Sequence, residues 1–359
     1  MARQSQKCDA VNASIGRMAT GGLVVVGCGW IAQRHAAAAR RLRRPLIFAS
    51  RDVERARRYA RTFGGVAAYG SYADALADPR AEGAIICTPH DRHLADARAA
   101  FAAGKHVLIE KPLARTLDEA DEIIAAAGAA DRVLMVAEQF HFMPAFRRVK
   151  AILDSGRLGA LRELHLIARG FGARSGWRLA ADVVGGGTLI DGGIHYVHNL
   201  RWWGGDVRRV VALRPPQTVP AMEGEDAVSL LAELGSGALG LLSNSLGAPG
   251  LARLQWSTVT GTRGSCFADN RGRFVMVRGE GGARLWLFRR DRGGYEAMLT
   301  AFGHAMAGEA PVEMDAAAGR ADLAVVLSAY RSMAEGRVVD LESPGLARAG
   351  LEPVELARC

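Results

Sequence analysis

LVVVGCGWIA, at residues 23–32, is the most informative segment of this 359-residue chain. An apolar run rich in β-branched residues comes first, and a glycine-containing turn follows it directly. A segment rich in alanine and arginine then continues with a helical pattern to residue 44, and a second apolar run occupies residues 46–49. Strand, glycine turn, helix and strand in this order predict a βαβ unit at the start of the folded chain.

The same alternation continues as far as residue 136. Apolar runs typical of buried strands occupy residues 83–87, 106–110 and 133–136. Helical patterns occupy residues 53–63, 72–77, 92–103 and a segment that begins at residue 116. Strands that alternate with helices favour a parallel sheet covered on both faces. We therefore predict an α/β, Rossmann dinucleotide-binding domain over residues 21–141.

The pattern changes after residue 142, where a helical segment at residues 145–154 is followed by short strand-like segments. These segments lie at residues 161–168, 207–213, 227–234, 238–246, 253–260, 273–278 and 284–288, and helical patterns return at 295–307 and 320–335. Turns as short as Gly235-Ser236-Gly237 join neighbouring strands, which only antiparallel hairpins allow. The sequence predicts a second domain of the α+β class, with a mainly antiparallel, open-faced sheet. The predicted boundaries are a flexible extension at 1–20, a substrate-binding and oligomerisation domain at 142–345 and a tail at 346–359.

The composition is that of a folded globular protein, with 49% hydrophobic and 23% charged residues. The formal net charge is +9, but the 46 basic residues are spread along the chain in ones and twos and include only four lysines. The sequence has no zinc-finger spacing and no basic strand with interleaved aromatic residues, so we expect no nucleic-acid partner. No apolar run approaches the ~20 residues of a membrane span, so we expect no membrane association. Five widely spaced cysteines without a CxxC pair favour a reducing, cytoplasmic setting.

The turn in the opening segment has the spacing Gly27-x-Gly29-x-x-Ala32. Gly27 permits the tight turn, Gly29 lets a pyrophosphate approach the backbone, and Ala32 lets the helix pack on the strand. The helix that begins at Trp30 and Ile31 offers unpaired backbone N–H groups to the phosphates. Alone, this spacing can be an ordinary glycine turn, but its place in a βαβ unit predicts binding of NADP or NAD.

The end of the second predicted strand reads Ala49-Ser50-Arg51-Asp52. An acidic residue that grips the ribose hydroxyls of NAD usually stands where this chain has Ser50. A hydroxyl followed by the guanidinium of Arg51 suits the ribose phosphate of NADP, so NADP is favoured. Two alternatives remain open, because Asp52 can be an ordinary turn residue or can bend back to the ribose and restore a preference for NAD.

Glu110-Lys111-Pro112 ends a buried strand at the carboxyl edge of the predicted sheet, where open α/β folds bind their ligands. We expect Glu110 and Lys111 to lie beside the cofactor. A lysine at this place can donate a proton or polarise a carbonyl group. The alternative is a solvated strand end without a chemical role.

Residues 185–195 read GGGTLIDGGIH. If a helix begins near Thr188, Asp191 and His195 lie at positions i and i+4, where the carboxylate can orient the imidazole and raise its basicity. This spacing predicts an acid–base pair. Two alternatives are a metal site that adds His198, and a buried pair with a structural role only.

Thr88, Pro89, His90 and His93 follow the strand that ends at Cys87. His90 and His93 form an HxxH spacing, but no other cluster of ligands supports a metal site. We expect this segment to be a loop beside the cofactor, with Thr88, Pro89 and His93 in contact with it.

Together these segments resemble the Gfo/Idh/MocA family of NAD(P)-dependent sugar and cyclitol oxidoreductases. The resemblance extends from about residue 22 to residue 341. It rests on VVVGCGWIA at 24–32, CTPHDRH at 87–93, AGKHVLIEKPLA at 103–114, PAFRRVKAILDSGRLGAL at 144–161, GGGTLIDGGIHYVHNLRWWGG at 185–205 and AYRSMAEGRVVDL at 329–341.

The resemblance implies that Lys111, Asp191 and His195 line the substrate pocket and are the catalytic residues. In the implied reaction a hydride passes between a secondary alcohol carbon and the nicotinamide. His195 exchanges the hydroxyl proton, Asp191 orients His195, and Lys111 stabilises the developing alkoxide.

The family pattern also implies substrate contacts for Trp177 and Arg178, which match a WR pair in many members, and for Gln139 and His141 at the entry of the second domain. Two departures stand out. Ser50 replaces an acidic residue, and Gln139-Phe140-His141 replaces a more frequent Asn-Arg-Arg type of sequence.

The resemblance favours an oxidoreductase acting on a sugar, aminosugar or cyclitol. Two other functions occur on the same fold: a glycosidase that uses tightly bound NAD, and a non-enzymatic regulator that senses nucleotides. The joint presence of Lys111, Asp191 and His195 argues against the regulator. Because an antiparallel sheet with one open face is a common surface for self-association, we expect a homodimer or homotetramer.

Overall fold

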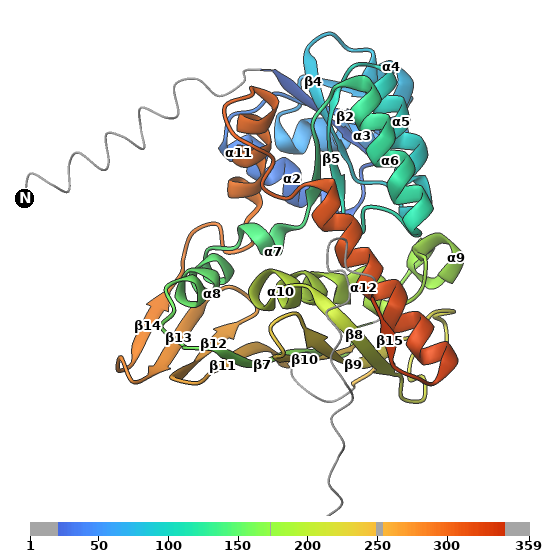
Figure 1. The fold of residues 1–359 in the computed structure, drawn as a ribbon. Coiled ribbons are helices and arrows are strands. Elements are labelled where there is room, and N and C mark those ends of the chain that lie inside the picture. Colours follow the sequence, from blue (N-terminus) through green and yellow to red (C-terminus); the bar gives the residue numbers. More distant parts are fainter. Residues whose placement is uncertain (1–20, 173, 249–253, 342–359) are drawn as a thin grey trace, which may run out of the picture.

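The computed structural model describes residues 21–172, 174–248 and 254–341, which form two lobes built around one sheet each (Figure 1). The extension predicted at residues 1–20 and the tail predicted at 346–359 lie outside these ranges. Among the described residues, no helix is long and apolar enough to cross a membrane.

The first lobe contains a parallel sheet of six strands in the order β3-β2-β1-β4-β5-β6. The strands are β1 (Gly22–Val26), β2 (Leu46–Ala49), β3 (Ala67–Tyr69), β4 (Ala81–Ile86), β5 (His106–Glu110) and β6 (Leu134–Ala137). Strand β1 pairs with β2 on one side and with β4 on the other, so the strand order reverses beside it. This order confirms the predicted Rossmann sheet. Strand β3 was not predicted, because its three residues are only partly buried and carry no clear pattern.

Helices cover both faces of this sheet. The connecting helices are α2 (Trp30–Arg41), α3 (Val53–Phe63), α4 (Tyr72–Leu76), α5 (His93–Ala102) and α6 (Leu117–Ala130). Helices α5 and α6 pack together on one face, and α2 lies on the other with α11 (Tyr295–Met306), which comes from late in the chain (Figure 1). Helix α11 therefore brings residues from the end of the sequence to the first lobe.

The second lobe contains nine strands in the order β14-β13-β12-β11-β7-β10-β9-β8-β15. They are β7 (Leu161–Arg169), β8 (Val207–Leu213), β9 (Ala227–Leu234), β10 (Leu239–Ser245), β11 (Leu254–Gly261), β12 (Gly264–Asp269), β13 (Phe274–Gly279), β14 (Arg284–Leu287) and β15 (Val339–Asp340). All described neighbours except β7 and β10 are antiparallel, which confirms the predicted sheet type. Helices α8 (Pro144–Asp154), α10 (Ile194–Gly204) and α12 (Ala316–Glu335) lie over one face only (Figure 1).

Helix α12 joins the two lobes, because it contacts β8 in the second sheet as well as β6 and α6 in the first lobe. Just before α12, the carbonyl of Met314 accepts a hydrogen bond from the Val136 N–H at 2.9 Å. Farther along, Arg320 forms an ion pair with Asp121, with Nη2 and Oδ2 2.8 Å apart. These contacts hold the second lobe against the carboxyl edge of the parallel sheet.

Short elements fill the junction between the lobes. They are η2 (His90–Arg92), α7 (Gln139–Phe142), η3 (Gly176–Leu179), α9 (Ala181–Val184) and the π-helical turn η4 (Leu189–Gly193). Turn η4 leads directly into α10, so the helix predicted near Thr188 begins with a wide turn. Elements η2, α7, η3 and η4 contribute residues to the lining of the cavity described next.

Candidate active site

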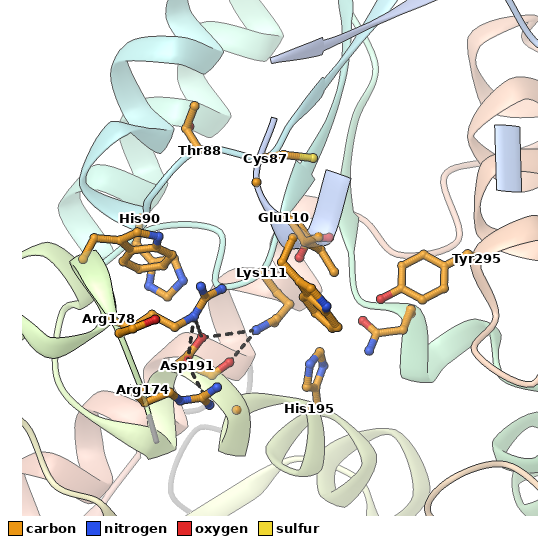
Figure 2. A pocket seen from close by; sticks show the side chains of 17 residues that line it. Cys87, Thr88, His90, Glu110, Lys111, Arg174, Arg178, Asp191, His195 and Tyr295 are labelled. Atoms are coloured by element: carbon orange, nitrogen blue, oxygen red, sulfur yellow. Dashed lines mark hydrogen bonds and ion pairs between the residues drawn. The ribbon is translucent and has the colours of Figure 1, made fainter. Parts of the chain in front are cut away.

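A cavity of about 470 Å³ opens at the carboxyl edge of the parallel sheet, between the two lobes (Figure 2). The first lobe contributes the turns that follow β1, β4 and β5, and α11 contributes Tyr295. The second lobe contributes η3, η4 and the start of α10. A cavity of this size suits a small organic ligand.

The turn after β1 is shaped for a diphosphate. Gly27 has a φ of +92°, a left-handed conformation that a residue with a Cβ adopts only with strain. A Cβ added to Gly29 would meet no atom within 4 Å, so a ligand can approach the backbone there. The N-terminus of α2 carries no side-chain cap and no acidic residue in its first turn, which leaves its N–H groups available. The residues present therefore fit the pyrophosphate of a nicotinamide dinucleotide.

Lys111 reaches from the end of β5 to the second lobe. Its Nζ donates a hydrogen bond to the backbone carbonyl of Asp191 and lies 3.9 Å from Asp191 Oδ1 (Figure 2). Its neighbour Glu110 points to α2 instead, where Glu110 Oε1 lies 2.7 Å from His35 Nε2. The two adjacent charges are thus separated, and only the lysine engages the second lobe.

Three cationic side chains surround the carboxylate of Asp191 (Figure 2). Besides Lys111, Arg174 Nη2 lies 2.9 Å and Arg178 Nε 3.3 Å from Asp191 Oδ2. Burial alone would raise the pKa of Asp191, but the attraction of Lys111, Arg174 and Arg178 outweighs it and holds the pKa well below its usual value. Asp191 is therefore a permanent anion, not a group that exchanges protons near neutral pH.

His195 has a different partner from the one the spacing predicted. Its Nδ1 lies 2.7 Å and 2.8 Å from the two carboxylate oxygens of Glu138, not beside Asp191. The prediction that Asp191 orients His195 is wrong, because η4 turns the Asp191 carboxylate toward the arginines. Phe140 stacks on the imidazole of His195, with ring centroids 4.6 Å apart, and fixes its plane. Glu138 and Phe140 together set the orientation of His195.

Tyr330 and Glu225 form hydrogen bonds with the turn that carries Asp191. The Tyr330 hydroxyl accepts hydrogen bonds from the Gly187 and Ile190 N–H groups at 3.0 Å and 3.2 Å. It lies 3.1 Å from Glu225 Oε1, which also accepts the Leu189 N–H at 2.8 Å. Helix α12 and the segment before β9 thus provide acceptors for the Gly187, Leu189 and Ile190 N–H groups.

Several other predicted residues line the cavity: Gly29, Trp30, Ile31, Thr88, Gln139 and Trp177. Trp177 packs edge-on against His90, with ring centroids 4.8 Å apart, and lies under the guanidinium of Arg178. Burial lowers the pKa of His90 well below its usual value, so this imidazole is neutral. A neutral ring is a good packing surface for Trp177.

Two predicted contact residues point away from the cavity. His93 is fully buried, and its Nδ1 and Nε2 lie near the carbonyls of Pro112 and Thr88 at 2.9 Å and 3.3 Å. His141 Nδ1 lies 3.1 Å from His198 Nε2, away from the cavity lining. Neither side chain therefore lines the cavity, although both were predicted to contact a ligand.

The metal alternative has no structural support in the residues described. His198 pairs with Asp322 rather than with Asp191 or His195, with Nδ1 2.9 Å from Asp322 Oδ2. Within residues 21–172, 174–248 and 254–341, no group of three or more His, Cys, Asp or Glu could hold a metal ion.

Sequence reasoning missed Glu138, Arg174 and Tyr295. A signal for Glu138 existed, because it directly follows β6 at the same sheet edge as Lys111. Arg174 precedes Arg178 by four residues in a segment without a helical pattern, so its spacing carried no information. Tyr295 comes from α11, and no local pattern links that helix to the first lobe.

A Rossmann sheet whose carboxyl edge faces ionisable groups from a second lobe is an arrangement typical of NAD(P)-dependent oxidoreductases. Comparison with protein families gives the same class. Residues 22–138 match the oxidoreductase family with an NAD-binding Rossmann fold, and residues 146–267 match the GFO/IDH/MocA C-terminal domain. The chain belongs to the Gfo/Idh/MocA family of oxidoreductases, as the resemblance in its sequence implied.

Individual relatives span nearly the whole chain. The 1,5-anhydro-D-fructose reductase of Ensifer adhaerens is 28% identical over 82% of this chain and 90% of its own length. The myo-inositol 2-dehydrogenase of Thermotoga maritima is 29% identical over 89% of this chain and 98% of its own length. The solved structure of GenD2 from gentamicin A biosynthesis, in complex with NAD, is 27% identical with a TM-score of 0.81, covering 91% of this chain and 98% of that one.

Proposed function

We propose that this oxidoreductase transfers a hydride between NAD(P) and a secondary alcohol or ketone carbon of a sugar, aminosugar or cyclitol. The observation that carries the proposal is that Lys111 from the first lobe and His195 from the second line the same cavity as Gly29. The names of the relatives from Ensifer adhaerens and Thermotoga maritima support a substrate with several hydroxyl groups.

His195 is the proposed proton carrier. With Nδ1–H donating to Glu138, the neutral imidazole presents its Nε2 lone pair to a substrate hydroxyl. When the alcohol is oxidised, its hydroxyl proton passes to Nε2, and the resulting imidazolium is stabilised by the Glu138 carboxylate. Ketone reduction returns that proton to the oxygen.

Lys111 is the proposed stabiliser of the substrate oxygen. Its ammonium group is held by the backbone carbonyl of Asp191, so it does not rotate freely. A fixed positive charge stabilises an oxygen on which negative charge develops. A bound nicotinamide supplies the acceptor or donor of the hydride.

The dinucleotide is proposed to be NADP rather than NAD. Asp52 caps α3, where its Oδ1 accepts the Arg55 N–H at 3.2 Å, and Ser50 Oγ accepts the Asp52 N–H at 3.3 Å. The Asp52 side chain thus faces α3, while Arg51 is exposed. This arrangement favours a ribose phosphate over free ribose hydroxyls.

The working form is proposed to be a homodimer or homotetramer that pairs the uncovered faces of the second sheet. Side chains on this face include Leu231, Leu239, Met276 and Leu285, all of them exposed. Trp256, Phe267 and Phe274 stack in a row on the same face, with centroids 6.0 Å and 5.8 Å apart. Such a patch is unusual on a monomer. Sedimentation should show a dimer or larger species, and a monomer alone would contradict the proposal.

The test of the function is a panel of sugars and cyclitols assayed with NADPH, NADP, NADH and NAD while the absorbance of the reduced nicotinamide is followed. We expect net cofactor turnover, and a loss of about 10²-fold or more in kcat for His195→Ala. The control is Lys150→Gln, which changes an ion pair with Asp154 on α8, outside the cavity lining. Glycoside hydrolysis without net cofactor turnover, or full activity of His195→Ala, would reject the proposed reaction.

A further inference from the structure

The charges around Asp191 do not balance. Lys111, Arg174 and Arg178 all lie within 4 Å of this one carboxylate, which can neutralise only one of them. Among the described residues that line the cavity, the other carboxylate is Glu110, whose Oε1 lies 2.7 Å from His35 Nε2 rather than beside these cations. With Glu110 included, the cations of the lining still outnumber its carboxylates, and the surplus of positive charge lies around Asp191.

Binding of a substrate in the cavity raises the free-energy cost of this surplus of positive charge. The side chains of Arg174, Arg178 and Lys111 are only 28%, 29% and 13% exposed, and all three line the cavity. A substrate that displaces water from the cavity removes hydration from the cations. A neutral ring with hydroxyl groups replaces that hydration poorly, whereas an anionic group replaces it well.

Arg178 is arranged to receive such a group. Its Nε faces Asp191 at 3.3 Å and its guanidinium lies 4.4 Å from the centroid of Trp177, so the plane of the fork is fixed. Among the described residues, neither of its two Nη atoms has a hydrogen-bond partner. Arg178 lines the cavity on the side of Lys111. A planar, immobile fork is the geometry that binds a carboxylate or a phosphate with two hydrogen bonds.

We propose that the substrate carries an acidic group, a carboxylate or a phosphate ester, which Arg178 and Arg174 bind while the reacting carbon lies by Lys111 and His195. This inference rests on the proposed function and narrows its substrate class to acidic sugars or cyclitols. Asp191 then acts as the spacer that holds the three cations in place, because without it they would repel one another.

The experiment compares three ligands that share a sugar ring and differ in the group at the exocyclic carbon. D-Glucose has a hydroxyl group there, D-glucuronate has a carboxylate, and the third ligand is the glucose monophosphate with its phosphate ester on that hydroxyl. Dissociation constants are measured by calorimetry, with and without NADPH, so the result does not depend on turnover. We expect one acidic ligand to bind about 10-fold or more tightly than glucose, with an affinity that falls as salt increases. Carboxylate and phosphate are told apart by which of the two acids binds.

Three variants make the result specific. Arg178→Gln should remove most of the preference for the acidic ligand over glucose, whereas Arg178→Lys should keep part of it. Arg98→Gln, which changes an exposed pair with Glu122 on the surface, is the matched loss of one positive charge and should have no effect.

Equal or weaker binding of both acids, or no binding of any ligand, would overturn the inference. So would an equal effect of Arg178→Gln on acidic and neutral ligands. The proposed function fails on a different readout, namely absence of NADPH and NADH binding or of turnover with every polyol. Turnover of neutral sugars only would leave the function standing and reject the acidic substrate.

Discussion

The imidazole of His195 pairs with the buried carboxylate of Glu138, with Nδ1 2.7 Å from Oε1. Glu138 follows β6 in the first lobe, whereas His195 lies at the start of α10 in the second. The pair therefore forms only when the two lobes are in place. It gives the proposed proton carrier a fixed tautomer and a counter-charge.

Replacing Glu138 with glutamine tests this pair directly. Because the amide keeps the shape and removes the charge, Glu138→Gln should lower kcat by about 10–100-fold with little change in KM. The pH dependence of kcat/KM should also change, since the amide does not supply the negative charge that Glu138 places beside the imidazole of His195. Glu122→Gln, at an exposed site on α6, is the control. A profile that keeps its shape would assign Glu138 a structural role only.

The stability of the protein should depend on the same carboxyl group. Burial disfavours its charge, but His195 outweighs burial and lowers the pKa of Glu138 from 4.5 to about 2. The folded state thus binds this proton less readily than the unfolded state, so the ionised group stabilises the fold above pH 4.5 and the contribution is lost as pH falls toward 2. The difference in unfolding free energy between wild type and Glu138→Gln, from urea titrations, should shrink below pH 4.5. A constant difference would refute this linkage.

Cofactor preference should depend on Arg51. Removal of its charge in Arg51→Gln should weaken NADPH binding by about 10-fold, because a charge-assisted hydrogen bond to the ribose phosphate is lost. Affinity for NADH should not change. Arg61→Gln, an exposed residue in the last turn of α3, is the control. Parallel loss of both affinities, measured by fluorescence titration, would show that Arg51 does not read the phosphate.

The turn that carries Asp191 should loosen when its support is removed. Tyr330→Phe leaves the Gly187 and Ile190 N–H groups without their acceptor, which should reduce the free energy of unfolding by about 1–3 kcal/mol. KM should rise as well, since the turn no longer holds Asp191 in a fixed position in the cavity. Tyr72→Phe on α4, whose hydroxyl makes no hydrogen bond to a described residue, is the comparison. Equal unfolding free energies for the two variants would contradict this role of Tyr330.

Local pattern was enough for the fold and for part of the site. The apolar runs that became β1, β4 and β5 are continuous because both faces of a parallel sheet are buried. The glycine turn and Lys111 follow two of these runs directly, so their place at the sheet edge was predictable. The position of a residue in the fold can be predicted from sequence when that residue directly follows a strand.

Tertiary structure alone decided which charges meet. Glu138 and His195 are 57 positions apart, and Lys111 and Asp191 are 80 positions apart. Their pairing depends on how η4 opens the first turn before α10 and on how α12 holds one lobe against the other. Spacing along a helix suggested Asp191 as the partner of His195, but the attraction of three cations and a π-helical turn directed that carboxylate elsewhere. Which charged groups pair depends on their distance in the folded protein. Sequence spacing predicts that distance only within a single helix or strand.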